Sequence, residues 1–221
     1  FIPMIIKFDE HLEMPTTRIE YSYYLMAKDV GLKMMPSRLL EGETSTHFLT
    51  ERFDRVGNTK VHTQTLAAMN PLANSYEDLF DVACRIGILP AELSQLFLLM
   101  TMNVLSGNID DHNKNFSFMM ATDGVWHITP AYDFTFSVDT SAPGYINRHC
   151  LTINNKNADI ERADLLQIAK RYNIKGAESI INKAVDVVSN YAHYAQLANI
   201  NEHWTNKIVE EIGYKIGVLN G

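Results

Sequence analysis

The stretch Gly107–Ser117, GNIDDHNKNFS, decides how the rest of this chain is interpreted. It follows a strongly apolar helical run and precedes two predicted strands, so we expect a loop held between rigid elements. Its eleven residues include two carboxylates, a histidine, a lysine and three asparagines, which contribute little to a core. Loops that present such groups from a rigid scaffold are frequent sites of catalysis. This loop is therefore the first candidate for a functional site.

A second polar stretch, Thr129–Phe134 (TPAYDF), follows the two predicted strands and adds Asp133. Phosphoryl transfer needs a carboxylate to accept the proton of the attacking hydroxyl, oxygen ligands for Mg²⁺, and a cation near the phosphates. Asp110 supplies the base, Asn115 a neutral oxygen ligand and Asp133 an anionic one. Because a short hairpin joins the two loops, they can converge on one metal ion. We predict a metal-assisted phosphoryl-transfer site.

The composition is that of a soluble globular protein, with 46% hydrophobic and 20% charged residues among 221. This length accommodates one large domain or two small lobes. The net charge of -7 disfavours non-specific binding to nucleic acids or anionic membranes, which requires a basic surface. We therefore expect protein and small-molecule partners, with no direct nucleic-acid binding and no membrane binding.

The two cysteines, Cys84 and Cys150, have no metal-binding spacing, and we expect reduced, mostly buried thiols in the cytoplasm. No stretch approaches the ~20 apolar residues that cross a bilayer. The apolar start, Phe1–Ile6, is too short for a signal peptide and has no basic region before it. Because an initiator methionine is missing, we expect the chain to begin inside a longer protein.

The first third of the chain predicts a small α+β lobe. Pro3–Phe8 reads as a buried strand with Lys7 near its end, and 19–30 as a helix that ends at Gly31. Glu20 fits two roles, a capping-box partner of Thr17 or an ion pair with Lys7. Further strands are predicted at Ser37–Glu41, Thr46–Phe53 and, as a short one, Lys60–His62.

From Ser75 onward the pattern becomes helical. Helices are predicted from Ser75 to Ile86 and from Pro90 to about Leu105, the second apolar on nearly all sides and hence the buried axis. Phe116–Met120 and Val125–Ile128 should form a hairpin. A short strand is expected at Cys150–Ile153. Three helices, Arg162–Tyr172, Gly176–Ala198 and Asn201–Gly217, should close the chain.

The motifs in their order resemble the HipA-like serine/threonine protein kinases of bacterial toxin–antitoxin systems. The polar loop DDHNKN at 110–115 and TPAYD at 129–133 carry the resemblance. Further similar segments are IIK (5–7), IEY (19–21), AKDVGL (27–32), TERFDR (50–55) and TINNKN (152–157). The resemblance implies an α+β, two-lobed protein-kinase-like fold. Residues 1–70 would form a β-rich nucleotide-binding lobe, and residues 71–221 a helical lobe with the catalytic and metal-binding loops.

Position by position, the resemblance implies roles for single residues. Asp110 would be the catalytic base, Lys114 would steady the transferred phosphoryl group, and Asn115 and Asp133 would bind Mg²⁺. Lys7 would contact the phosphates of ATP. The adenosine would be held, partly through backbone groups, by Glu51, Phe53 and Asp54 of the TERFDR segment, which resembles the hinge of the family.

Two further loop residues are assigned supporting roles. We expect His112 to fix the loop rather than to take part in the chemistry, and Asp111 to shape the loop or to be solvated. The family also implies a toxin role, a HipB-like helix-turn-helix antitoxin as partner, and a translation component such as an aminoacyl-tRNA synthetase as protein substrate.

Three alternatives stay open at this point. Phosphoinositide kinases share the Asp-x-His-x-x-Asn loop, and a metal-dependent phosphohydrolase has a similar set of carboxylates. The third alternative is a pseudokinase that acts as a binding module, because the family's Gly- and Ser-containing phosphate loop precedes the lysine strand and is not in this sequence.

Overall fold

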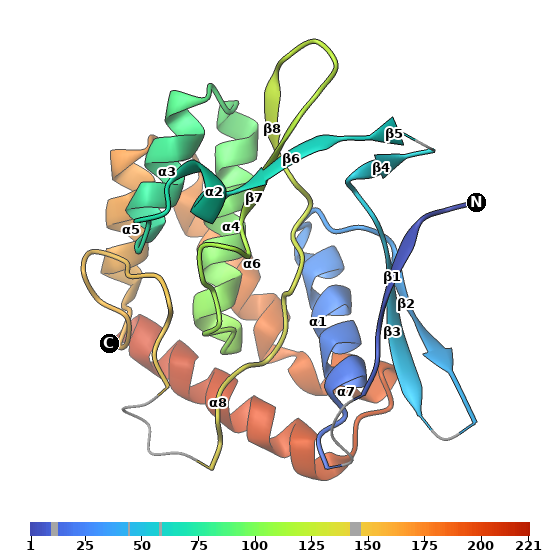
Figure 1. Cartoon of the computed structure of the whole chain (residues 1–221). Coiled ribbons are helices and arrows are strands. Elements are labelled where there is room, and N and C mark those ends of the chain that lie inside the picture. The colour runs from blue at the N-terminus through green and yellow to red at the C-terminus, as the bar shows by residue number, and fades with distance from the viewer. Residues whose placement is uncertain (10–12, 44, 58, 142–146) are drawn as a thin grey trace.

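The computed structural model describes residues 1–9, 13–43, 45–57, 59–141 and 147–221 (Figure 1). Its first sheet has the order β1-β3-β2, with β1 (Met4–Lys7) and β2 (Ser37–Glu41) both antiparallel to β3 (Thr46–Glu51). The predicted strands form, although β3 ends two residues earlier than expected. The expected burial of the first strand is wrong: β1 lies at the edge of the sheet, and Ile5 and Ile6 are 44% and 41% exposed. Lys7 is paired with Phe48 in the register of this sheet, so both side chains face the same side.

Helix α1 (Thr16–Val30) packs between this sheet and the helical part of the chain. Its buried stripe includes Ile19, Tyr23, Met26 and Ala27. The predicted end at Gly31 is confirmed, but the capping box of Thr17 and Glu20 is wrong. The Asp9 carboxylate instead accepts the Thr17 backbone N–H at 2.9 Å and leaves Glu20 free for another partner.

Side chains of α1 also reach the helical part of the chain. Arg18 Nη1 donates to the Ala198 carbonyl at 3.1 Å, the Tyr23 hydroxyl donates to the Ser106 carbonyl, and Ser22 Oγ lies 3.1 Å from the Tyr191 hydroxyl. These contacts fix α1 to two other helices as well as to the sheet.

The chain then forms a small hairpin of β4 (Arg55–Val56) and β5 (Thr59–Lys60) before β6 (His62–Thr65). The single short strand predicted at Lys60–His62 is therefore divided between β5 and β6. β6 pairs antiparallel with β7 (Ser117–Met120), which pairs with β8 (Trp126–Ile128). The predicted hairpin after the polar loop is confirmed. It forms a three-stranded sheet with β6, which precedes residue 70. The domain boundary at residue 70 stays a prediction.

Helix α4 (Pro90–Ser106) is the buried axis that its composition predicts. Twelve of its residues are buried, and it contacts α6 and α8. α2 (Leu66–Met69) and α3 (Tyr76–Arg85) lie before it in the chain, and Ser75 with Asp78 forms a capping box at the start of α3. The chain leaves α4 at Gly107 and enters the polar loop.

The closing part holds four helices instead of three: α5 (Arg162–Arg171), α6 (Ala177–Ser189), α7 (Tyr191–Leu197) and α8 (Glu202–Asn220). The predicted helix Gly176–Ala198 breaks at Asn190, whose ψ of 21° departs from helical values. The turn there places the fully buried Tyr191 against α1. The expected strand Cys150–Ile153 is wrong, since only the isolated bridges Ser75–Thr152 and Ile153–Lys156 form.

The expectation for the two cysteines is met only in part. Cys84 and Cys150 are both free thiols, as expected, but both are exposed rather than buried, which corrects the sequence prediction. Within the described residues, no helix is long and apolar enough to cross a membrane.

Gly107 directs the chain from α4 into the polar loop. It adopts φ 72°, in the left-handed region, and its N–H donates to the Asn103 carbonyl. A Cβ at this position would lie 3.1 Å from Val138 Cγ2 and 3.2 Å from Phe136 Cε2. Glycine is therefore required by the backbone conformation and by the close approach of a neighbouring segment.

We expect Gly107→Ala to lower the free energy of unfolding by about 2 kcal/mol or more, because a left-handed L-residue costs about 1–2 kcal/mol and the contact adds to this. Gly124→Ala is the matched control, since Gly124 has φ 81° with open space around it. It should cost only the conformational part, about 1 kcal/mol. Urea unfolding measures both variants, and equal losses would contradict a role for the contact with Phe136.

Candidate functional site

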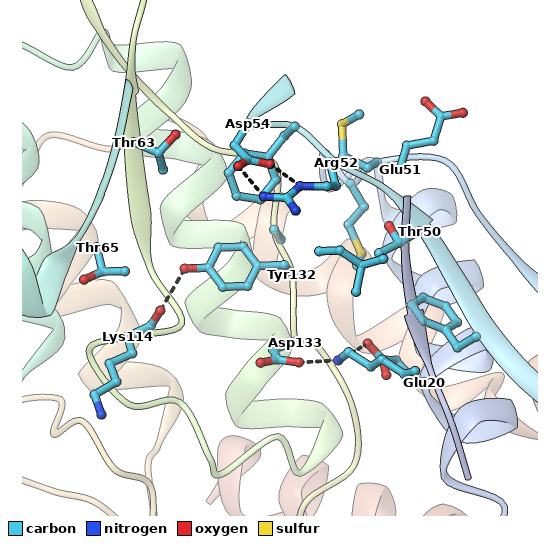
Figure 2. A pocket seen from close by; sticks show the side chains of 17 residues that line it. Glu20, Thr50, Glu51, Arg52, Asp54, Thr63, Thr65, Lys114, Tyr132 and Asp133 are labelled. Carbon is cyan, nitrogen blue, oxygen red and sulfur yellow. Dashed lines mark hydrogen bonds and ion pairs between the residues drawn. The ribbon is translucent and has the colours of Figure 1, made fainter. Parts of the chain in front are cut away.

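A pocket of about 410 Å³ lies between the first sheet and the segments that flank the polar loop (Figure 2). This size is within the range of small-molecule sites. Apolar side chains form much of its wall, namely Ile5, Met34, Met35, Phe48, Phe53, Ala131 and Tyr132. Its polar groups are Lys7, Glu20, Thr50, Glu51, Arg52, Asp54, Thr63, Thr65, Lys114 and Asp133.

The Lys7 ammonium lies between two carboxylates in this pocket. Lys7 Nζ donates to Glu20 Oε1 at 2.7 Å and also to Asp133 Oδ1. Of the two roles open to Glu20, the ion pair with Lys7 is therefore the one that forms. Lys7 comes from β1, Glu20 from the second turn of α1, and Asp133 from the segment after β8. Three elements distant in the sequence meet at one cation.

These contacts set the charges of the group. Burial acts to lower the pKa of Lys7, but the charges of Glu20 and Asp133 outweigh it and raise the pKa, so Lys7 stays protonated. Burial raises the pKa of Glu20, and the nearby Lys7 does not fully offset it. One ammonium shared by two carboxylates neutralises neither completely.

Asp133 is held in place by its own backbone segment. The Ala131 N–H donates to the Lys33 carbonyl at 2.8 Å, which fixes the segment beside the residues that follow α1. Asp133 itself has φ 53°, a left-handed conformation that costs about 1 kcal/mol or more and persists where the surroundings impose it. Such conformations cluster at functional sites.

The part of the wall that follows β3 is stiffened by an ion pair and a ring contact. Arg52 holds Asp54 with two parallel hydrogen bonds of 2.7 and 2.6 Å, and the bond from Arg52 lowers the pKa of Asp54. The rings of Phe53 and Tyr132 lie 5.5 Å apart, and the Tyr132 hydroxyl donates to the Lys114 carbonyl at 2.8 Å. The Asp54 carboxylate is thus already engaged by Arg52, and both Phe53 and Asp54 line the pocket.

The polar loop presents Asp110 to solvent. Its side chain is 63% exposed, with Oδ1 3.9 Å from His112 Nε2 and 3.8 Å from Cys150 Sγ. Asn115 Nδ2 donates to the Asp110 carbonyl at 2.8 Å, which leaves the Asn115 side-chain oxygen as an acceptor. His112 thus lies beside Asp110, and its supporting role stays a prediction.

Asp111 points the opposite way and is fully buried. It accepts hydrogen bonds from the Tyr76 hydroxyl at 2.6 Å, from His149 Nδ1 at 2.9 Å and from the Cys150 backbone at 2.8 Å. It shapes the loop, which is one of the two roles expected for it. Tyr76 and His149 lie far from the motif in sequence, and no local pattern marks them as its partners.

The structure brings six of the eight predicted site residues to one pocket: Lys7, Glu51, Phe53, Asp54, Lys114 and Asp133. The side chain of Lys114 extends away from Asp133 (Figure 2). Asp110 and Asn115 lie on the loop on either side of Lys114 and do not line the pocket. Tyr132 and Arg52, which sequence reasoning missed, belong to the TPAYD and TERFDR segments and were detectable from them, whereas Met34 and Met35 follow no recognisable pattern.

The donor set suits a hard cation bound with few protein ligands. Within the described residues there is no cluster of three or more histidine, cysteine, aspartate or glutamate side chains that could hold a metal ion. Mg²⁺ does not require one, because it commonly takes one or two carboxylates and completes its shell with substrate oxygens and water. The half-exposed Asp133 carboxylate and the free oxygen of Asn115 fit this mode.

Two solved structures have a similar fold. HipA of Shewanella oneidensis MR-1, from its complex with HipB and operator DNA, aligns with a TM-score of 0.70 at 15% identity over 97% of this chain and 58% of its own. The Helicobacter pylori proinflammatory kinase CtkA aligns with a TM-score of 0.63 at 16% identity, over 98% of this chain and 87% of its own. The chain thus has the two-lobed, kinase-like α+β fold that its motifs predict, and it spans just over half of that HipA.

Sequence comparison assigns the family. No curated protein matches the chain. The family model described as the HipA-like C-terminal domain matches residues 2–214. Because this match extends over nearly all of the sequence, the chain belongs to the HipA-like C-terminal domain family.

Proposed function

We propose that this chain is the catalytic part of an ATP- and Mg²⁺-dependent serine/threonine protein kinase. The observation that carries the proposal is Lys7, held by Glu20 from a helix and by Asp133 from a second segment, inside a pocket of nucleotide size. A strand lysine paired with a helix glutamate and placed beside a metal-binding aspartate is the arrangement that kinase catalysis requires.

In this proposal the pocket holds ATP. The adenosine lies against the segment Glu51–Asp54, where backbone groups and the Phe53 ring are available and the ion pair of Arg52 with Asp54 keeps the segment in shape. Lys7 contacts the phosphates, and Glu20 orients its ammonium. Asn115 and Asp133 bind Mg²⁺. When bound, ATP and Mg²⁺ supply the phosphoryl group and neutralise its charge.

The chain's own residues would complete the transfer. Asp110 accepts the proton of the attacking hydroxyl, for which its exposed carboxylate is suited. The Asn115 amide is oriented by its bond to the Asp110 carbonyl, so base and metal ligand are fixed together. Lys114, between them in the loop, steadies the transferred phosphoryl group.

The biological setting is proposed from the family. In the Shewanella structure HipA is in a complex with HipB and operator DNA, and a HipB-like helix-turn-helix antitoxin is the partner we propose for the protein that contains this chain. A toxin role in the cytoplasm follows from such a pair. The proposed substrate is a protein of translation, such as an aminoacyl-tRNA synthetase.

Cys150 reports on the charges at the transfer site without any need for activity. Its thiol donates to Asp110 Oδ1, and its backbone N–H donates to Asp111. Burial raises the pKa of the Cys150 thiol to about 11, with further contributions from the charges of Asp111 and Asp110.

We expect Asp133→Ala to abolish the stabilisation of the chain by ATP with Mg²⁺. At about a hundred times its Kd, the nucleotide should stabilise the wild type by about 2.7 kcal/mol, seen as a higher Tm. Asp186→Ala, at an exposed aspartate of α6, is the matched control and should keep the full shift. If ATP with Mg²⁺ does not raise the Tm of the wild type, the proposal of a nucleotide site is contradicted.

Asp110→Ala should keep that ATP-dependent shift but lower phosphoryl transfer by about a hundredfold or more, the usual contribution of a general base. Transfer is measured with labelled ATP and a host lysate, followed by analysis of the phosphorylated amino acid. Undiminished transfer by the variant would remove Asp110 from the mechanism. Label on phosphoinositides instead of proteins would favour the lipid-kinase alternative.

Alkylation of Cys150 by iodoacetamide should be slow at pH 8 in the folded chain, because a thiol of such a pKa is then only roughly a thousandth thiolate. The rate should rise about tenfold per pH unit up to the pKa, and Asp110→Ala should increase it at pH 8. Mass spectrometry of the Cys150 peptide separates it from Cys84. The same peptide in urea is the reference, and an equal rate in the folded chain would contradict the raised pKa.

A further inference from the structure

The buried carboxylate of Asp111 is the least accessible charged group near the proposed transfer site. A carboxylate removed from water costs several kcal/mol unless hydrogen bonds replace its hydration. Asp111 Oδ2 accepts from the Tyr76 hydroxyl and His149 Nδ1, and Oδ1 accepts from the backbone of Cys150 and, at 3.4 Å, of Leu151. Four donors from α3 and the segment 149–151 therefore converge on one loop residue.

From Tyr76 the hydrogen bonds continue through the interior. Asn103 Nδ2 donates to the Tyr76 hydroxyl at 3.0 Å, and Asn108 Nδ2 donates to Asn103 Oδ1 at 2.9 Å. Asn103 and Asn108 are almost completely buried. Ser137 Oγ lies 3.4 Å from Asn108 Oδ1 and is the next member of this chain of bonds.

Ser137 connects this series of hydrogen bonds to the backbone of the polar loop. Its hydroxyl oxygen accepts from the backbone N–H of Ile109 at 2.8 Å and of Asp110 at 3.0 Å. The backbone of Asp110 is thus held on one side by Ser137 and on the other, through the next residue, by the donors to Asp111. In this series of hydrogen bonds each side chain donates to the next, from Ser137 to Asn108, Asn103, Tyr76 and finally Asp111.

We infer that Asp111 and Ser137 are positioning residues that hold Asp110 in place for proton acceptance, an inference that rests on the proposed function. The Asp110 side chain is mostly exposed, with only long contacts to Cys150 Sγ at 3.8 Å and His112 Nε2 at 3.9 Å, so the position of its backbone largely sets where the carboxylate lies. Displacement of a reacting group by about 1 Å can cost a hundredfold in rate. Neither residue lines the nucleotide pocket, so their effect falls on the transfer step and not on ATP binding.

The test compares Tyr76→Phe, Ser137→Ala and Asp111→Asn in the same chain. Each should lower kcat for phosphoryl transfer by about 10- to 100-fold. The KM for ATP should stay within about twofold and the ATP-dependent Tm shift should persist, because the pocket is untouched. Ser137→Thr, which keeps the hydroxyl, should restore most of kcat. Tyr76→Phe and Ser137→Ala keep the test valid if Asp111→Asn fails to fold.

Tyr172→Phe is the matched control. The Tyr172 hydroxyl also donates to an aspartate, Asp81 Oδ1 at 2.7 Å, but away from the polar loop, so its loss should leave kcat unchanged. A kcat equal to that of the wild type in both Tyr76→Phe and Ser137→Ala would overturn the inference but leave the proposed function standing. So would a fall in kcat accompanied by loss of the ATP shift, which indicates general disruption. Absence of transfer by the wild type would overturn the proposed function and the inference with it.

Discussion

The Lys7 ammonium is the constraint on which the arrangement of the pocket depends. It joins a strand, a helix and a segment 126 residues further along the chain. Burial acts to lower the pKa of Lys7, and the charges of Glu20 and Asp133 together raise it above its ordinary value. The first sheet, α1 and the segment after β8 must therefore approach one another closely. The apolar wall of the pocket then encloses the space beside this cation.

The adjacent aspartates of the polar loop divide into an exposed and a buried one. The Asp110 side chain is largely exposed to solvent. Asp111 is buried, and four hydrogen-bond donors replace the hydration of its carboxylate. Several donors at fixed positions define the orientation of the carboxylate and of the loop that carries it. Asp111 is therefore the aspartate that gives the loop its shape, whereas the sequence leaves open whether it shapes the loop or is solvated.

Much of the fold can be predicted because its signals are local. The all-apolar run of α4, the glycines after α1 and α4, and the hairpin of β7 and β8 each depend on a few neighbouring residues. The misses depend on distant ones. Asp9 caps α1 from another segment, Ser137 acts from an irregular stretch, and the break at Asn190 buries Tyr191 against α1. In the candidate site, the motif identified the residues around the pocket, but the network behind Asp111 follows no pattern.

The attachment of α1 on two sides has a consequence for control. In many kinases a helix that carries the glutamate swings outward and separates it from the lysine, which turns catalysis off. Here Arg18, Ser22 and Tyr23 bind α1 to α7 and to the end of α4, and its apolar face is completely covered. Rotation of α1 would break these buried contacts together. In the proposed kinase, blocked entry to the pocket or displacement of β1 would leave these contacts of α1 intact, whereas an outward swing of α1 would not.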